Sequence, residues 1–201
     1  MTSVKRMLGV ALVTACVALA MAQQPPAAQI TIGGKAPNLK LQTLPGAAAQ
    51  LHSLSGQNGT LLLFVATKCP VSNDYNERMA ALAKDYTSRG FSVIGINSNK
   101  TEPADEVNKH AAEKGLAFTI LKDPDNVVAD YFGASFTPEA YLFDREWTLR
   151  YHGRIDDSRN AANITSQDLR TALDALQAGK AVPVAETKAF GCTIKRVAKG
   201  S

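Results

Sequence analysis

Residues 61–70 read Leu-Leu-Leu-Phe-Val-Ala-Thr-Lys-Cys-Pro, the most informative stretch of this chain. Its apolar run is typical of a buried strand, and Pro70 suits the first position of a following helix. Cys69 is therefore expected at a strand-to-helix junction, where unpaired N–H groups and the helix dipole favour a thiolate. Lys68 adds positive charge beside it. Because such surroundings lower a cysteine pKa below its usual value of about 8.5, we interpret Cys69 as the chemical centre.

Strand and helix patterns alternate along the rest of the chain, which predicts an α/β architecture in one domain. A hairpin is expected within residues 30–52. The last helix carries an apolar stripe from Leu169 to Leu176, with Thr165 or Ser166 as its cap and Gly179 after its end. The remaining expected elements are strands at 60–66, 91–96, 118–121, 140–143 and 148–155, helices at 70–89 and 103–114, and a helical turn at 127–132.

Composition is that of an ordinary globular domain. The chain has 201 residues, of which 45% are hydrophobic and 20% are charged. Of the 22 Lys and Arg, Lys5 and Arg6 lie in the predicted leader, which leaves 20 against 18 acidic residues, a net charge of +2. This charge is too small to indicate a nucleic-acid or anionic-membrane partner.

The first 22 residues have the pattern of a secretory signal peptide, with charge at Lys5-Arg6, an apolar stretch and Ala20-Met21-Ala22 before the cut. Residues 13–16 resemble a lipoprotein box ending at Cys16, but lipidation there would leave an apolar mature start, so cleavage after Ala22 is favoured. Residues 23–33 are expected to be a flexible lead-in. The chain is thus predicted to be exported, periplasmic or secreted, where disulfides persist.

Four stretches together resemble the thioredoxin fold, in particular its peroxiredoxin-like branch, the alkyl hydroperoxide reductase/thiol-specific antioxidant group. They are Gly34–Leu41, Ala66–Ser72 around the cysteine, Thr137-Pro138 before a strand, and Tyr151–Asp157. The resemblance implies a central mixed sheet flanked by helices at residues 34–180, with an N-terminal hairpin extension and a C-terminal tail at 181–201. It also implies that Pro138 is a cis-proline that shapes a substrate-facing loop.

The chain departs from that group at places that matter for activity. Peroxiredoxins carry a proline seven residues, and a threonine or serine three residues, before the attacking cysteine. Here those positions hold Leu62 and Ala66, and Thr67 is one place off, which weakens a peroxidase interpretation. Ser72 stands where related redoxins have the second cysteine of Cys-x-x-Cys, so no local resolving thiol is present.

Cys192 is the only other cysteine of the predicted mature chain, and it lies in the basic tail near Lys195 and Arg196. Exchange chemistry needs a second thiol to release a mixed disulfide, so Cys192 is the candidate resolving thiol. The alternative is an inert staple, because closing a loop of about 120 residues contributes on the order of 5 kcal/mol in the chain-entropy model. We favour the redox pair because Cys69 occupies an activated position.

Two further side chains are candidates for the site. Ser72 either donates a hydrogen bond to the Cys69 sulfur or is a solvated first-turn serine. Arg154 either holds an anionic sulfur or peroxide or, the interpretation we favour, pairs with an aspartate at the strand end. The three histidines show no ligand spacing, and a copper or zinc site on the two cysteines and one histidine is the least favoured alternative.

The leading hypothesis is an exported thiol–disulfide oxidoreductase that acts on protein or small-molecule thiols and disulfides without a bound cofactor. Its expected catalytic residues are Cys69, Cys192, Pro138, Thr67, Ser72 and Arg154. One alternative is an antioxidant thiol peroxidase that uses Cys69. Another is a disulfide-stapled binding or metal-carrier domain in which the redox fold is only a frame.

Overall fold

A seven-stranded mixed sheet forms the centre of the molecule, in a computed structural model that describes residues 29–199. The strand order is β2-β1-β5-β4-β3-β7-β8; β3, β4 and β5 are parallel, and the other neighbouring pairs are antiparallel. These strands are β1 (Lys40–Thr43), β2 (Ala48–Gln50), β3 (Gly59–Phe64), β4 (Phe91–Asn97), β5 (Thr119–Lys122), β7 (Glu139–Phe143) and β8 (Leu149–Gly153). The predicted mixed sheet flanked by helices is confirmed.

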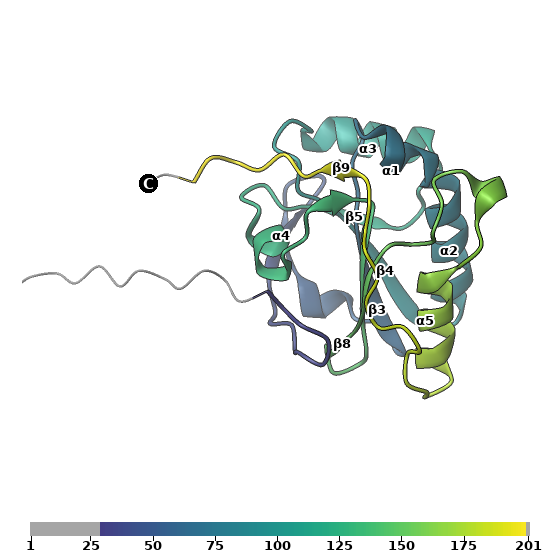
Figure 1. The fold of residues 1–201 in the computed structure, drawn as a ribbon. Helices are drawn as coiled ribbons and strands as arrows, with labels where there is room; N and C mark the ends of the chain where they lie inside the picture. The colour runs from purple at the N-terminus through teal and green to yellow at the C-terminus, as the bar shows by residue number, and fades with distance from the viewer. Residues whose placement is uncertain (1–28, 200–201) are drawn as a thin grey trace, which may run out of the picture.

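Helices cover both faces of this sheet (Figure 1). α2 and α5 pack on one face, and α4 packs on the other. Two short 3-10 helices lie in the connections. The helical elements are α1 (Pro70–Asp74), α2 (Asn76–Ser88), α3 (Ala104–Glu113), α4 (Val127–Phe132), α5 (Asp168–Gln177), η1 (Leu51–Leu54) and η2 (Ala161–Asn163).

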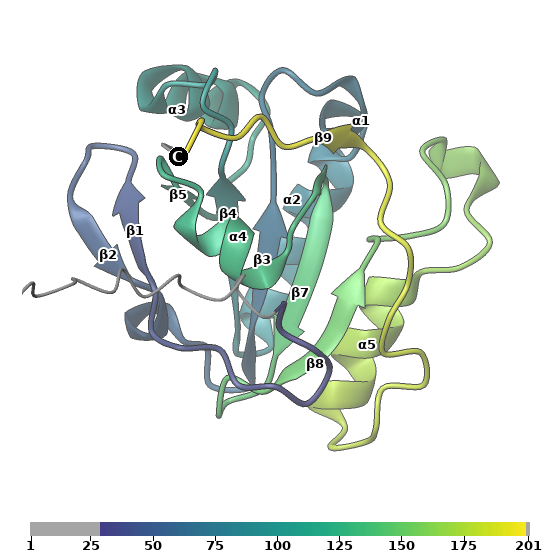
Figure 2. The same ribbon diagram turned by 60° about the vertical axis from the view of Figure 1, so that its left-hand side comes forward.

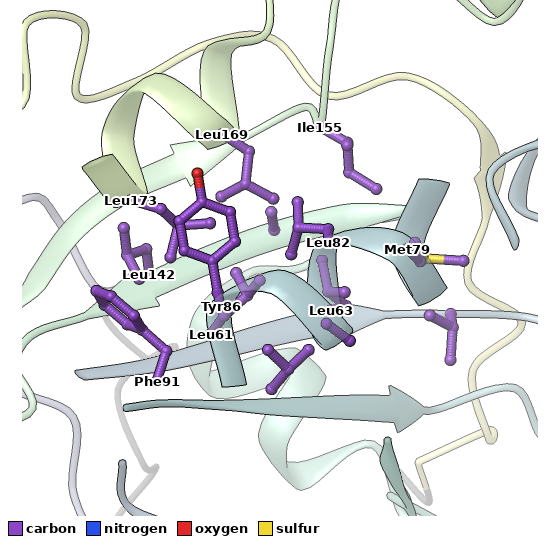
Figure 3. Packing of buried hydrophobic residues seen from close by; sticks show 14 of the residues in the cluster. Leu61, Leu63, Met79, Leu82, Tyr86, Phe91, Leu142, Ile155, Leu169 and Leu173 are labelled. Carbon is purple, nitrogen blue, oxygen red and sulfur yellow. The ribbon is translucent and has the colours of Figure 1, made fainter. Parts of the chain in front are cut away.

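The central strand β3 is buried along its whole length because both of its faces are covered. Successive side chains of a strand point to opposite faces. Leu61 and Leu63 therefore pack with α2 and α5, whereas Leu62 and Phe64 pack with α4. Figure 3 shows the first of these two cores, with Leu82 and Tyr86 of α2 near Leu169 and Leu173 of α5.

The helix expected over residues 70–89 is interrupted at Tyr75, which separates α1 from α2. The Tyr75 ring is buried, and its hydroxyl donates to Asp156 Oδ1 at 2.7 Å. The guanidinium of Arg78 lies over the ring, 3.5 Å from its centre. The prediction of one continuous helix is therefore wrong: the helix is divided at this buried, hydrogen-bonded tyrosine.

The predicted cap of the last helix is also wrong. α5 begins at Asp168, and Gln167 before it makes no side-chain cap bond. The Thr165 hydroxyl instead donates to Asp157, and the Ser166 hydroxyl donates to Asp168 Oδ1 at 2.9 Å. The two expected cap residues therefore hold the preceding loop and the first helical carboxylate.

At the N-terminal end, the predicted hairpin is present as β1 and β2 and extends the sheet by pairing with β5. The predicted signal peptide, Cys16 and the start of the lead-in lie outside the described residues. Between residues 29 and 199, no helix is long and apolar enough to cross a membrane.

The C-terminal tail wraps over the domain after α5 (Figure 2). It first pairs with β8, where His152 N donates to Ala185 O and Thr187 N donates to His152 O. It then forms β9 (Cys192–Thr193), which pairs antiparallel with β6 (Phe136–Thr137). Lys195 finally bonds to Asn99 and Lys100 beyond the end of β4. The tail thus crosses the carboxyl end of the parallel strands, where ligand sites of α/β sheets are common.

Candidate active site

Cys69 sits at the junction that the sequence predicts. It is the N-cap residue of α1 after the end of β3, and Pro70 opens the helix. The Ser72 N–H donates to the Cys69 sulfur at 3.3 Å, and the side chain of Cys69 is buried, with 3% of the residue exposed. A backbone donor aimed at this sulfur stabilises the thiolate after reduction.

Ser72 therefore does donate to the sulfur, through its backbone. Its hydroxyl points elsewhere and accepts a hydrogen bond from Ala66 N at 3.2 Å. The residue is completely buried, so the alternative of a solvated serine is wrong. Ser72 consequently ties the last turn before Cys69 to the first turn of the helix.

A buried carboxylate that sequence reasoning missed holds the loop before Cys69. Glu102 Oε2 accepts from Thr67 N and Glu102 Oε1 accepts from Lys68 N, both at 2.9 Å. Asn97 Nδ2 also donates to Oε2, at 2.6 Å. Burial raises the pKa of Glu102, but these donors outweigh it and leave the pKa below its usual range.

Lys68 and Thr67 contribute differently from expectation. The Lys68 ammonium is 2.7 Å from Glu106 Oε2 and donates to Thr101 O, so its charge is already paired. The predicted help from Lys68 to the thiolate is therefore largely cancelled. The Thr67 hydroxyl is buried and has no hydrogen-bond partner within residues 29–199.

Cys192 is joined to Cys69 by a disulfide, with Cα atoms 5.8 Å apart, a usual Cα separation for a disulfide. The cysteines lie 123 residues apart in sequence. Cys192 reaches this position because it stands opposite Thr137 in the β6–β9 pair. The pairing that the sequence left open is thus present in the structure.

The Thr137-Pro138 peptide bond is cis, as the resemblance implies. The Thr137 carbonyl oxygen lies 3.3 Å from the Cys69 sulfur. Residues 136 and 137 therefore run directly beside the disulfide, and they offer their backbone edge to the strand that carries Cys192.

A second buried carboxylate, also missed by sequence reasoning, holds that strand. Glu139 Oε2 accepts from Ser135 N and Phe136 N, both at 2.8 Å, and Oε1 lies 2.7 Å from His152 Nε2. Burial raises the Glu139 pKa, but His152 and these N–H groups outweigh it and lower the pKa below its usual range. A carboxylate directly before the apolar run 140–143 was a signal for such a role.

Arg154 takes the role of an ion-pair partner. Its Nε donates to Asp168 Oδ2 at 2.7 Å, which is the Arg–Asp pair that the sequence analysis favoured, although the partner lies at the start of α5. The histidines are also dispersed, since His52 stacks on Trp147 and His110 lies against Asn76. Among residues 29–199, no three His, Cys, Asp or Glu side chains gather in a metal-ligand cluster.

Comparison with known proteins places the chain among redoxins. Thiol-disulfide oxidoreductase ResA of Bacillus thuringiensis (strain Al Hakam) is 26% identical over 118 residues, 59% of this chain and 66% of that protein. The chain thus matches just under two thirds of that relative's length. Among solved structures, a hypothetical protein of Sinorhizobium meliloti 1021 is 35% identical, with a TM-score of 0.78, over 86% of this chain and 98% of that one.

A second solved structure agrees. An uncharacterized conserved protein of Geobacillus kaustophilus is 32% identical, with a TM-score of 0.79, over 86% of this chain and 95% of that one. More distant structures, such as a putative thiol:disulfide interchange protein DsbE of Chlorobium tepidum with a TM-score of 0.62 and 21% identity, share the fold. The model of the AhpC/TSA family matches residues 32–152, more than half of the chain and including Cys69. The chain therefore belongs to the AhpC/TSA family.

Proposed function

We propose that the chain is an exported thiol–disulfide oxidoreductase of the peroxiredoxin-like type, with Cys69 as the nucleophile and Cys192 as the resolving thiol. The observation that carries the proposal is the disulfide between these two cysteines. It joins a sulfur at an activated strand-to-helix junction to a sulfur on a separate peripheral strand. The similarity to thiol–disulfide oxidoreductase ResA supports the same class of reaction.

The exchange proceeds in two steps. In the reduced protein, the Cys69 thiolate attacks one sulfur of a substrate disulfide, a mixed disulfide forms, and the other substrate sulfur leaves as a thiolate. The Cys192 thiolate then attacks the Cys69 sulfur, which closes the internal disulfide and releases the second substrate thiolate. Two electrons pass from the protein dithiol to the substrate, and protons exchange with water. The reverse sequence oxidises a substrate dithiol.

Neighbouring groups support these steps. The Ser72 N–H stabilises negative charge on Cys69, and Glu102 fixes the loop in front of it. The cis bond before Pro138 turns the Thr137 backbone edge toward the disulfide. Thr67, in the same loop, places a buried hydroxyl near the nucleophile in sequence. Arg154 has no part in this scheme because Asp168 engages it.

Export is supported by the leader pattern at residues 1–22 and by the disulfide itself. Disulfides persist in oxidising compartments such as the periplasm, where exchange partners are other exported thiols and disulfides. A direct check is N-terminal sequencing of the protein recovered from the extracytoplasmic fraction. A mature start at Gln23 supports the proposal, and recovery of the intact chain from the cytoplasm contradicts it.

The reduction potential of the Cys69–Cys192 couple tests the function. Free thiols are counted by mass after alkylation across a dithiothreitol or glutathione series, with Cys192→Ser as the control that cannot form the bond. A potential above about −300 mV marks an exchange-competent pair, and a lower potential marks a structural staple. The second result would favour a disulfide-stapled binding domain.

A peroxidase is the second candidate, because the family match covers Cys69 and because the Thr67 hydroxyl in the same loop has no hydrogen-bond partner in the part of the chain that the structure describes. In that reaction, peroxide transfers one oxygen to the Cys69 thiolate, which gives sulfenic acid and releases water or alcohol. Stoichiometric peroxide added to reduced Cys192→Ser, followed by dimedone labelling, measures this step. Oxidation no faster than that of free cysteine rules it out.

A further inference from the structure

The tail segment around Cys192 is laid out as an extended peptide on the edge of β6. Cys192 stands opposite Thr137, and Thr193 stands opposite Phe136. Ile194 N donates to Ser135 O at 3.0 Å, and the Thr137 hydroxyl donates to Cys192 O at 3.5 Å. Backbone bonds of this kind recognise a strand without regard to most of its side chains.

Any other sulfur that bonds to Cys69 has to replace the sulfur of Cys192. A sulfur in a disulfide lies about 2.05 Å from its partner, with a restricted torsion, so the chain that carries it has few ways to approach. Cys69 itself is buried beneath the tail. A substrate cysteine that replaces Cys192 would therefore lie beside the same edge of β6 that pairs with residues 192 and 193 in this structure.

The residue before Cys192 shows how selective this edge is. Gly191 has φ = +153°, and a Cβ placed on it would lie 2.1 Å from the Thr137 carbonyl oxygen. A side chain at this position therefore collides with backbone, which cannot give way as a flexible side chain would. The β6 edge requires a glycine immediately before the cysteine.

The flanking side chains add a simpler preference. The Phe190 ring packs against Tyr75, with ring centres 6.2 Å apart. Thr193 is exposed, whereas Ile194 is buried in the core on the α4 side of the sheet. The segment therefore offers an aromatic residue, glycine, cysteine, a tolerant position and an apolar residue, in that order.

We infer that residues 190–193 stand in for a substrate, and that the reduced site accepts extended segments of other proteins in which a glycine precedes the reactive cysteine. This inference rests on the proposed function. In it, residues 190–193 lift away from β6 after reduction and the substrate segment takes their place. The tail then has two roles. It carries the resolving cysteine, and it competes with substrate segments for the β6 edge, so that only segments able to displace it can bind.

Mixed-disulfide formation tests this selectivity on the full chain carrying Cys192→Ser. Two heptapeptides with the sequence of residues 189–195 are prepared, one unchanged and one with alanine in place of glycine, each with its cysteine activated as a thiopyridyl disulfide. Release of thiopyridone reports attack by Cys69. Because the tail competes equally with both peptides, the ratio of their reaction rates measures the effect of the glycine alone.

The glycine peptide is expected to react about tenfold faster or more, since the alanine peptide must adopt a strained backbone or lose the β6 pairing. Thiopyridyl-activated N-acetylcysteine amide serves as the reference. Equal rates for the two peptides, with a fast reference reaction, overturn the selectivity and leave the proposed function intact. A reference reaction no faster than with free cysteine overturns both.

The same steric rule applies to the tail in the intact protein. Gly191→Ala is expected to shift the internal disulfide toward the dithiol by about tenfold in a glutathione equilibrium. Gly179→Ala is the matched control, because Gly179 also has a positive φ of +68° but its Cβ would meet nothing within 4 Å. An equal shift of the disulfide equilibrium in the two variants overturns the inference. It would mean that the shift does not come from the contact between residue 191 and the Thr137 backbone.

Discussion

The two halves of the disulfide rest on different kinds of structure. Cys69 follows the buried central strand β3 and is covered on most sides by the core. Cys192 lies half-buried on a two-residue strand that packs against the outside of the domain. The difference teaches that reduction need not disturb the nucleophile, because its position is fixed by the fold, whereas the resolving cysteine depends on a few local bonds.

Each half also has its own buried glutamate. Glu102 fixes the loop that leads to Cys69, and Glu139 fixes β6, the strand with which the Cys192 strand β9 pairs. Each carboxylate accepts hydrogen bonds from two consecutive backbone N–H groups. Glu102 accepts its two backbone bonds on different oxygens, whereas Glu139 accepts both on Oε2, and this difference can be tested by mutation.

Removal of either sulfur should have the largest effect, and the two losses should differ in kind. Cys69→Ser is expected to reduce exchange with a model disulfide to the background of a cysteine-free chain, because the nucleophile is gone. Cys192→Ser is expected to keep the first step and to accumulate the mixed disulfide, which mass spectrometry detects. Accumulation on Cys192 in the Cys69→Ser variant at a similar rate would contradict the asymmetry.

Glu102→Gln should destabilise the protein more than Glu139→Gln. Glu102 accepts Thr67 N and Lys68 N on different oxygens, so a glutamine amide must face one of these donors. Glu139 accepts both of its backbone donors on Oε2, so a glutamine oxygen can keep them. We expect a loss of about 2 kcal/mol for Glu102→Gln and under about 1 kcal/mol for Glu139→Gln.

Urea unfolding of the reduced proteins measures both values, with the wild-type chain as reference. Reduction removes the contribution of the disulfide, so that only the two carboxylates are compared. Equal losses would mean that the charge of each carboxylate, rather than the placement of its oxygens, carries its contribution.

Acid should weaken the protein through the same two groups. The pKa values of Glu102 and Glu139 are lowered in the fold, because hydrogen bonds to the carboxylates outweigh the effect of burial. A lowered pKa stabilises the fold fully above the unfolded value, about 4.3 for glutamate, and this contribution is lost as the pH falls through the folded value. The difference in unfolding free energy between the wild type and Glu102→Gln should therefore be smaller at pH 3 than at pH 7.

The smallest effect is expected from an ion pair near the end of the tail. Arg196 pairs with Asp130 at 2.7 Å in a partly exposed setting, so Arg196→Ala should cost less than about 1 kcal/mol of global stability. It should nevertheless speed amide hydrogen exchange around Val197, whose N–H bonds to Asn126. Arg159→Ala, which breaks an exposed pair with Asp74 away from the tail, is the control. Unchanged amide exchange would mean that the Arg196–Asp130 pair does not hold this part of the tail, and that contacts such as those of Val197 with Asn126 and of Lys199 with Asp130 do.

The sequence was informative where a local pattern carries the structure. The apolar run at β3 and the proline after Cys69 predicted the junction, because strand burial and helix initiation depend on neighbouring residues. The interruption of the helix at Tyr75 was missed because the hydroxyl bond that anchors this residue to Asp156 joins residues 81 positions apart. Local propensity cannot report such a contact.

The candidate site follows the same division. The cis bond before Pro138 came from a motif, and the pairing of the cysteines was stated as a possibility. The two glutamates were overlooked because their partners depend on the fold. Glu102 binds backbone N–H groups of residues 67 and 68, which are distant in sequence, and Glu139 binds those of residues 135 and 136 because the chain turns back at this point. Lys68 was misjudged because its partner Glu106 lies on α3, so that a charge next to Cys69 in sequence is neutralised in space.

The path of the tail has a kinetic consequence. Thr187 is bonded to β8, and Ile194 is bonded to Ser135, so only the six residues between them are free to move when the disulfide opens. Both ends of this short arch stay fixed, which confines Cys192 to a small volume around Cys69. Its effective concentration there is about millimolar or higher, comparable to that of a small-molecule thiol pool. A mixed disulfide on Cys69 is therefore expected to be short-lived, and a longer arch should extend its lifetime.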